Sequence, residues 1–374
     1  MALRSIALAL VAAWAVATGG SAQAQNKDFK IGVVASLTGA FTGPATDSVE
    51  GIKAWIKARG LPGKNIVFET LDDETTPVGA SNAFRRLAAN PDVVMIYAMV
   101  PSSSVMAIKS LAGEFKVPII CAGAADAIGI PADPWLFKVA PAVRDFMTVL
   151  ARYAKDHDVK RIAMLSGTDA FGQAEIGAMR ELAPKNGLEI VAAETYTAED
   201  TNFNAQLARI RAANPQLLYS GAFGRPAILM FQQFRQLGLQ IPLIMGQSIV
   251  TASFFTGIGG NKVADGVMVP IQLGVFGPSA GGESARLYAE LEKALGHQPT
   301  YYNTFGYDVG LITEAAVAKS DGTRKGIRDA LEAMKDLPAV NGPVTYRTED
   351  HTGQNERSIA IGALEDGKPV LPKK

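Results

Sequence analysis

The feature that most constrains the fold is a regular alternation of two kinds of segment along the chain. Short apolar runs typical of buried strands are separated by longer stretches in which apolar residues recur at helical spacing, as Val49, Ile52 and Ile56 do. The first strands are expected at residues 30–36, 65–71, 93–99 and 117–121. Strands that alternate with helices form a parallel sheet covered by helices on both faces.

The same alternation starts again after Pro141. The expected strands are 161–166, 188–196, 216–220, 242–245 and 266–270, and the expected helices are 173–183, 203–213 and 226–237. Helical stretches at 283–295, 301–318 and 324–334 follow, then short strands near 344–346 and 359–364. The sequence therefore predicts an α/β protein with two doubly wound parallel-sheet lobes. Ligands of such sheets bind beyond the carboxyl ends of the strands, so the expected site is a cleft between the lobes.

The first 24 residues have the three-part layout of a secretory signal peptide. Arg4 is followed by an apolar run over residues 6–17 and by the small-residue sequence Ala22-Gln23-Ala24. A membrane anchor is the alternative, but this run is shorter than the roughly 20 residues that span a bilayer. We therefore expect cleavage after Ala24 and release of the mature protein into the periplasm.

The charge balance and the scarcity of histidine and cysteine argue against several classes of function. The chain has 36 basic and 36 acidic residues, so nothing indicates nucleic acid as a partner. The single cysteine, Cys121, cannot form an internal disulfide. His157, His297 and His351 lack metal-ligand spacing, and the sequence has no nucleophile elbow or phosphate-binding loop. We expect a monomer without catalytic activity, metal or cofactor.

Five motifs, which together cover nearly all of the mature chain, resemble those of a known family. They are IGVVASLTGAFTGPATDSVEGIKAWI, LDDETTPVGASNAFRRL, the pair VPSSSVMAI and VPIICAGAAD, GTDAFGQ, and YYNTFGYDVGLI. In this order they are similar to the branched-chain amino-acid-binding proteins of ABC importers. The resemblance implies a type I periplasmic-binding fold. It also implies two partners, an inner-membrane permease and its ATPase.

The family fold implies that three crossover segments join the two lobes. The first lobe would then comprise residues 28–141 and 271–341, and the second lobe residues 142–270 and 342–374. The alternation of strands and helices does not by itself predict this exchange.

Ser102 is the first candidate ligand-binding residue. It follows the apolar run that ends at Val100, so it lies where a strand ends and a helix begins. Unpaired amides at a helix N-terminus, together with a hydroxyl, favour an anion. A simple helix-capping serine is the alternative. In the family that the chain resembles, the matching serine and neighbouring N–H groups hold the ligand carboxylate, which favours ligand contact for Ser102.

Two other positions differ from the family pattern. Amino-acid-binding members usually have a threonine or serine where this chain has Ala124, which leaves the backbone of Ala122 and Ala124 to bond a ligand. They have an acidic residue, paired with the ligand's α-ammonium, where this chain has Ser248, preceded by the uncharged Gln247. Burying an ammonium without a carboxylate partner costs several kcal/mol. The sequence therefore argues against an ordinary α-amino acid.

The other matched contact positions are aromatic or apolar. They are Phe41 or Pro44, Val100, Pro101, Phe171, Phe223 and Tyr302. Phe171 and Phe223 stand where tyrosines are common in amino-acid binders, which makes the expected pocket drier. The alternative is that one or two of the four rings belong to a lobe core. Arg225 is a nearby cation that either clamps a ligand carboxylate or lies in solvent at the cleft rim.

These residues lead to a hypothesis for the ligand, a small carboxylate-bearing molecule with an apolar or aromatic body. Ser102 and backbone amides would hold it, and Phe171, Phe223 and Ser248 would close upon it from the second lobe. Two alternatives stay open. One is a branched-chain or other apolar amino acid, with Gln247 or a water replacing the acidic partner. The other is a periplasmic sensory module that signals to a receptor instead of a permease.

Overall fold

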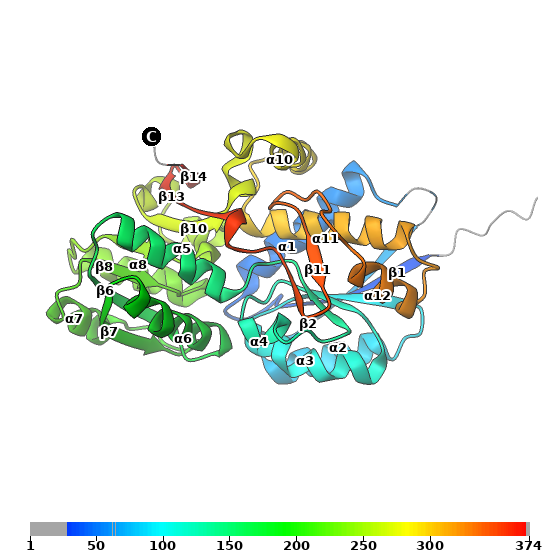
Figure 1. Cartoon of the computed structure of the whole chain (residues 1–374), viewed down its shortest axis with the longest axis horizontal. Coiled ribbons are helices and arrows are strands. Elements are labelled where there is room, and N and C mark those ends of the chain that lie inside the picture. Colours follow the sequence, from blue (N-terminus) through cyan, green and yellow to red (C-terminus); the bar gives the residue numbers. More distant parts are fainter. Residues whose placement is uncertain (1–27, 62, 64, 372–374) are drawn as a thin grey trace, which may run out of the picture.

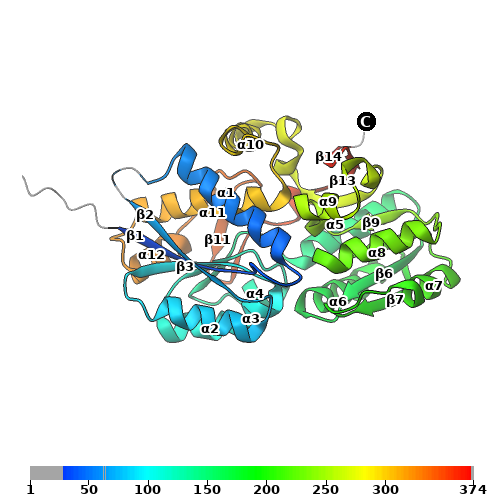
Figure 2. The same cartoon turned by 180° about the vertical axis from the view of Figure 1, so that it is seen from behind.

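The chain forms two α/β lobes that lie side by side (Figures 1 and 2). The computed structural model describes residues 28–61, 63 and 65–371, so the signal peptide expected over residues 1–24 lies outside the described residues. Each lobe is built around its own sheet, as the restarted alternation predicts.

The first lobe has a parallel sheet with the strand order β2-β1-β3-β4-β5. Its strands are β1 (Phe29–Ala35), β2 (Ile66–Asp72), β3 (Val93–Met99), β4 (Ile119–Cys121) and β5 (Leu136–Lys138). The helices between them are α1 (Thr42–Ala58), α2 (Pro77–Ala88), α3 (Ser102–Phe115) and α4 (Asp126–Gly129). The four expected strands are confirmed. β5 was not expected, since three residues are too few to show a pattern.

Later parts of the chain return to complete the first lobe. These are α10 (Gly282–Leu295), α11 (Tyr301–Ala318), α12 (Arg324–Glu332) and the hairpin of β11 (Thr345–Arg347) and β12 (Asp350–Gly353). α11 packs along α1, and the hairpin lies against β5, where His351 Nδ1 is 2.9 Å from the carbonyl oxygen of Leu136. The expected boundary at residue 342 placed this hairpin in the second lobe. It lies instead on the first lobe, because its buried face packs beside Phe137.

The second lobe has a sheet with the strand order β14-β13-β10-β9-β8-β6-β7. Its strands are β6 (Arg161–Gly167), β7 (Glu189–Tyr196), β8 (Leu217–Ser220), β9 (Leu243–Met245), β10 (Met268–Gln272), β13 (Ile359–Glu365) and β14 (Lys368–Val370). Its helices are α5 (Val143–Asp156), α6 (Ala170–Lys185), α7 (Asn204–Ala212), α8 (Gly224–Gln236) and α9 (Ala252–Gly257). β6 to β10 pair in parallel, and β13 adds to β10 in the antiparallel sense.

Three crossovers join the lobes. The first runs from β5 to α5, the second from β10 through η3 (Leu273–Ala280) to α10, and the third from β12 through η4 (Glu356–Ser358) to β13. Two shorter 3-10 segments, η1 (Gln247–Ile249) and η2 (Asn261–Ala264), lie in the second lobe. The predicted fold class, two α/β lobes built on mainly parallel sheets, is confirmed.

Candidate functional site

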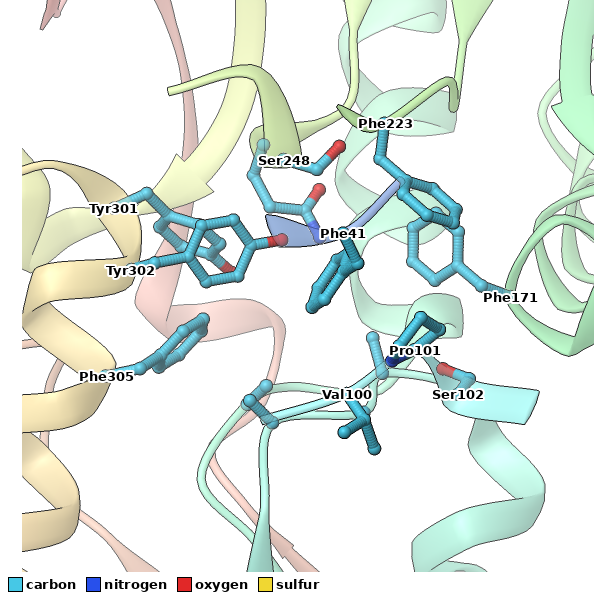
Figure 3. Close-up of a pocket in the computed structure, with 15 residues that line it drawn as sticks. Phe41, Val100, Pro101, Ser102, Phe171, Phe223, Ser248, Tyr301, Tyr302 and Phe305 are labelled. Carbon is cyan, nitrogen blue, oxygen red and sulfur yellow. The ribbon is translucent and has the colours of Figure 1, made fainter. Parts of the chain in front are cut away.

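A cavity lies between the lobes (Figure 3), and the space in and around it that no protein atom fills, open solvent included, is about 450 Å³. Its lining residues are Phe41, Val100, Pro101, Ser102, Ala122, Gly123, Ala124, Ala140, Phe171, Phe223, Gln247, Ser248, Tyr301, Tyr302 and Phe305. Most come from loops that follow β1, β3 and β4 of the first sheet and β6, β8 and β9 of the second. The cavity therefore lies beyond the carboxyl ends of strands from both sheets, where the sequence predicts the site.

Ser102 begins α3 directly below the cavity. β3 ends at Met99, so Val100 and Pro101 carry the chain from the sheet to the helix. Pro101 is the capping residue, and no side chain of the described residues caps this helix N-terminus. Ser102 is therefore not the capping serine of the alternative interpretation. Its Oγ instead accepts a hydrogen bond of 3.2 Å from the N–H of Ala125, which joins α3 to the loop after β4.

The loop after β4 forms the rest of the first-lobe wall. The N–H of Ala122 donates to the carbonyl of Ala98 at 3.3 Å, so it already has a partner in the sheet. The carbonyl of Ala124 accepts from the N–H of Val143 at 2.9 Å and from Lys138 Nζ at 3.1 Å. We expected the backbone of both alanines to be able to bond a ligand, but two of their four backbone polar groups already have partners. The Ala122 N–H and the Ala124 carbonyl are both occupied by protein partners.

Four aromatic rings cross the boundary between the lobes. Phe41 lies edge-on to Phe223 with ring centres 5.5 Å apart, and to Tyr302 at 5.9 Å. Phe223 in turn meets Phe171 at 6.2 Å. All four rings border the cavity, and Phe41, Phe223 and Tyr302 also belong to the buried apolar core. Edge-to-face rings such as these form a rigid apolar enclosure.

Local structure of the second lobe fixes the positions of Phe171 and Phe223. The carboxylate of Asp169 caps α6 by accepting a 2.9 Å hydrogen bond from the N–H of Gly172, which sets the first turn that holds Phe171. The N–H of Phe223 donates to the hydroxyl of Tyr196 at 3.3 Å. The loops that position these rings are therefore tied to the sheet.

The side of the cavity opposite Ser102 is polar but uncharged. Gln247 and Ser248 in η1 are only 4% and 5% exposed, and Ser248 Oγ donates weakly to the carbonyl of Ala222 at 3.4 Å. The hydroxyl of Tyr301 hydrogen-bonds with Gln247 and Gln272. Gln247 Oε1 has no partner among the described residues. A buried acceptor of this kind favours a ligand that brings a hydrogen-bond donor.

Sequence reasoning missed four lining residues, Gly123, Ala140, Tyr301 and Phe305. Tyr301 and Phe305 lie within one helical turn of the expected Tyr302, so the spacing in YYNTF indicates at least Phe305. Gly123 and Ala140 have no reactive or bulky side chain, and no signal in the sequence marks them.

Arg225 does not line the cavity. It is exposed in the first turn of α8, whose buried face is formed by Pro226 and Ala227. The expectation of a carboxylate clamp at this residue is therefore not met, because its side chain lies on the solvent side of the helix. Within the described part of the chain, no charged side chain lines the cavity.

The lobes touch at the edge of the cavity. Gly224 has a φ of +58°, and a Cβ at this position would lie 1.7 Å from the carbonyl oxygen of Ala40 in the first lobe. A Cβ on Gly43 would meet Ser253 of the second lobe at 1.9 Å. Such close approaches show that the two lobes are in direct contact at this edge of the cavity.

Two fully buried titratable groups lie behind the cavity walls. Lys138, at the end of β5, lies behind Ala124 of the first-lobe wall. Glu175 of α6 lies behind the second-lobe wall, where a Cβ on Gly221 would meet its carboxyl group, and it accepts a hydrogen bond from the Tyr219 hydroxyl. Burial raises the pKa of Glu175 to about 8, so this carboxyl is mainly protonated at neutral pH.

Metal-binding clusters and membrane-spanning helices are both absent from residues 28–371, apart from 62 and 64. No group of three or more histidine, cysteine, aspartate or glutamate side chains there has a metal-binding arrangement. None of the helices there has the length and apolar character needed to cross a membrane.

Two α/β lobes that are linked by three crossovers and have a cavity between them define a ligand-binding protein of the clamshell class. Residues 28–368 match the periplasmic binding protein family, and the chain belongs to this family. The family consists of solute-binding proteins. The resemblance to branched-chain amino-acid-binding proteins is also confirmed, since Leu/Ile/Val-binding protein homolog 1 of Brucella abortus is 26% identical over 352 residues, which cover 91% of this chain and 90% of that protein.

Solved structures agree with this assignment. An extracellular ligand-binding receptor from Rhodopseudomonas palustris HaA2 has a TM-score of 0.83 and 24% identity, covering 92% of this chain and 99% of that chain. An ABC-transporter solute-binding protein from Rhodopseudomonas palustris, solved in complex with benzoate, has a TM-score of 0.81 and 21% identity, covering 92% and 95%. These likenesses confirm the type I periplasmic-binding fold.

Proposed function

We propose that this protein is the periplasmic solute-binding component of an ABC importer and that its ligand is a small organic acid with an apolar or aromatic body. The observation that carries the proposal is the lining of the cavity between the lobes. Rings from both lobes enclose it, no charged side chain among the described residues lines it, and the uncapped end of α3 opens onto it.

The end of the cavity beside α3 suits a carboxylate. The first N–H groups of a helix lack helical partners and carry partial positive charge. At α3 no described side chain satisfies them, and Ser102 adds a hydroxyl donor that is 3% exposed. A carboxylate placed here would receive charge-assisted hydrogen bonds without a cationic side chain.

The rest of the cavity suits a body without an ammonium group. An ammonium near Gln247 and Ser248 would find acceptors but no negative charge, which leaves part of its desolvation cost uncompensated. Phe41, Phe171 and Phe223 offer apolar faces and edges to a flat ligand. The benzoate complex of the Rhodopseudomonas palustris relative supports an aromatic acid as the class of ligand.

Lobe closure would couple binding to transport. A ligand that contacts both lobes stabilises the closed form, and the permease then recognises that form. The expected signal peptide supports export to the periplasm. Mass spectrometry of the N-terminus and periplasmic fractionation test both points, and a mature chain that begins elsewhere than Gln25 would revise the cleavage site.

The ligand class is tested by thermal-shift measurement of the mature protein with benzoate, 4-hydroxybenzoate, 3-phenylpropanoate, 2-oxo-4-methylpentanoate and leucine. Binding to the native state adds about 2.7 kcal/mol of stability at a hundredfold excess over the Kd. We expect at least one acid to raise the Tm while leucine does not. A Tm shift with leucine and none with the acids would overturn the proposed ligand class.

A second candidate is a branched-chain amino acid. The unpartnered Oε1 of Gln247 favours it, since this oxygen can accept a hydrogen bond from an ammonium. The name of the Brucella abortus relative also supports it. Calorimetry of leucine against its deaminated analogue 4-methylpentanoate separates the two candidates, because only the amino-acid candidate requires leucine to bind more tightly.

A further inference from the structure

Lys138 is an unusual residue for its place in the fold. It ends β5 next to Cys121 of β4 and is completely buried. Its Nζ donates to the carbonyl of Ala124 at 3.1 Å, and no carboxylate among the described residues forms an ion pair with it. A buried ammonium without an ion pair is costly, so an apolar residue would be more favourable for stability alone.

The hydrogen bond to Ala124 does not by itself explain the lysine. The same carbonyl oxygen also accepts from the N–H of Val143 at 2.9 Å. It would therefore stay satisfied if Lys138 were an apolar residue.

The charged groups around Lys138 lie on several elements. They include Asp126 of α4, Asp145 at the start of α5 and Asp350 of β12. Asp126 and Asp145 have other partners, since Asp126 pairs with Arg144 and Asp145 accepts from the N–H of Ala142. Burial lowers the pKa of Lys138, whereas these carboxyls and Cys121 act in the opposite direction. His351, also on β12, lies near Glu332, with its Nε2 3.1 Å from a carboxylate oxygen of Glu332.

Lys138 is one peptide group away from the cavity. Ala124, whose carbonyl it contacts, lines the cavity, and so does Ala140, two residues further along the chain. The N–H of Ala125 reaches Ser102 Oγ at 3.2 Å. The ammonium thus lies behind the first-lobe wall, next to the N-terminus of α3 and the Ser102 hydroxyl.

We propose that Lys138 is a specificity-determining residue whose buried ammonium, acting through the thin wall at Ala124, makes the first-lobe end of the cavity select an anionic ligand over an uncharged one. This inference rests on the proposed function, in which the ligand carboxylate lies beside Ser102. In the low-dielectric interior, the charge of Lys138 acts across the Ala124 peptide group with little screening. Lys138 would therefore stabilise a carboxylate that it does not touch.

The test uses pairs of ligands that differ only in charge, benzoate with benzamide and 3-phenylpropanoate with 3-phenylpropanamide. Calorimetry would measure all four with the wild-type protein, Lys138→Met and Lys138→Gln. The glutamine variant keeps a donor for the Ala124 carbonyl while removing the charge. We expect both variants to lose about tenfold in affinity for the acids and less than twofold for the amides.

Lys109→Met is the matched control. Lys109 also donates to a carbonyl of this segment, that of Ala127 at 2.6 Å, but it does so in an exposed position. Its loss should leave the ratio of acid to amide affinity unchanged, because solvent screens its charge. If Lys138→Met does not fold, Lys138→Gln still decides the question.

Each outcome separates the two proposals. An equal loss for acids and amides, or no loss in either, means that Lys138 has only a structural role and overturns the inference while the ligand class stands. If the wild-type protein binds leucine and none of the acids, the proposed ligand class fails. Lys138 is then tested with leucine and leucinol, of which only leucine carries a carboxylate. An unchanged preference for leucine over leucinol in Lys138→Gln would overturn the inference in that case.

Discussion

The two walls of the cavity are backed by buried titratable groups of opposite kind. Behind the first-lobe wall lies Lys138, with the carboxyls of Asp126, Asp145 and Asp350 in its surroundings. Behind the second-lobe wall lies Glu175, which has the Tyr219 hydroxyl as a partner and a pKa raised to about 8 by burial. Burial lowers the pKa of Lys138, and the carboxyl groups near it act against that effect. No cation among the described residues lies beside Glu175, which is mainly protonated at neutral pH.

This difference is the basis on which we propose that a cavity without charged lining discriminates by charge. The polarity of each wall depends on groups that lie behind it, and a buried group keeps its charge only where opposite charges support it. Under the role proposed for Lys138, the first-lobe wall is electropositive and the second-lobe wall close to neutral. Four measurements test this contrast between the two walls.

The largest expected effect is on stability, in Glu175→Gln. The pKa of Glu175 is about 8 in the folded protein and 4.5 for an ordinary glutamate. Its contribution to stability is therefore complete below pH 4.5 and is lost as the pH rises through 8. Between these limits the wild-type protein should lose roughly 5 kcal/mol relative to Glu175→Gln. Urea unfolding at pH 5 to 9 measures this, and parallel curves for the two proteins would mean that both walls are backed by charged groups.

Next in size is the effect of separating the walls with Gly224→Ala. Its Cβ would meet the Ala40 carbonyl across the lobe boundary, so the closed form becomes less populated and affinity for a bound acid should fall about a hundredfold. Gly238→Ala is the control, since Gly238 has a φ of +62° and open space around it. Both variants share the backbone strain, and only Gly224→Ala blocks closure. Similar affinities in the two variants would contradict the contact between the lobes described above.

Charging the second-lobe wall should have a smaller effect. In Gln247→Glu a carboxylate replaces the amide whose oxygen has no partner, and we expect about 30-fold weaker binding of benzoate and stronger binding of leucine. Gln247→Leu has a similar volume without charge and should change benzoate binding much less. Calorimetry with both ligands measures this reversal. Unchanged selectivity in Gln247→Glu would show that the ligand does not lie near η1.

The smallest expected effect is that of Ser102→Ala, which removes one hydroxyl from the first-lobe wall. Loss of a single hydrogen bond to a carboxylate should weaken benzoate binding roughly tenfold. Ser104→Ala is the matched control, because Ser104 is buried in the same helix but does not line the cavity. Equal effects of the two variants would remove Ser102 from the proposed carboxylate site.

Much of the site was predictable because its residues follow strands that the apolar runs reveal. Ser102, Phe171, Phe223 and Gln247 each come shortly after such a run, and parallel strands bring their carboxyl ends to one edge of a sheet. The resemblance to the family then selected positions within those loops. For Arg225 the sequence left two alternatives open, because proximity to Phe223 does not reveal which face of α8 an arginine occupies, and the structure favours the exposed one.

From the sequence alone follow the alternation of most strands and helices, the presence of two sheets and the uncharged character of the residues after β9. These features depend on local periodicity and residue type, which the chain carries in short segments. The three-dimensional fold was needed to see that Lys138 and Glu175 are buried, that the β11–β12 hairpin covers β5, and that Tyr301 lines the cavity. Burial depends on elements distant in sequence. Lys138 is enclosed partly by residues near 350, and the segment LFKVA contains no pattern that predicts this contact.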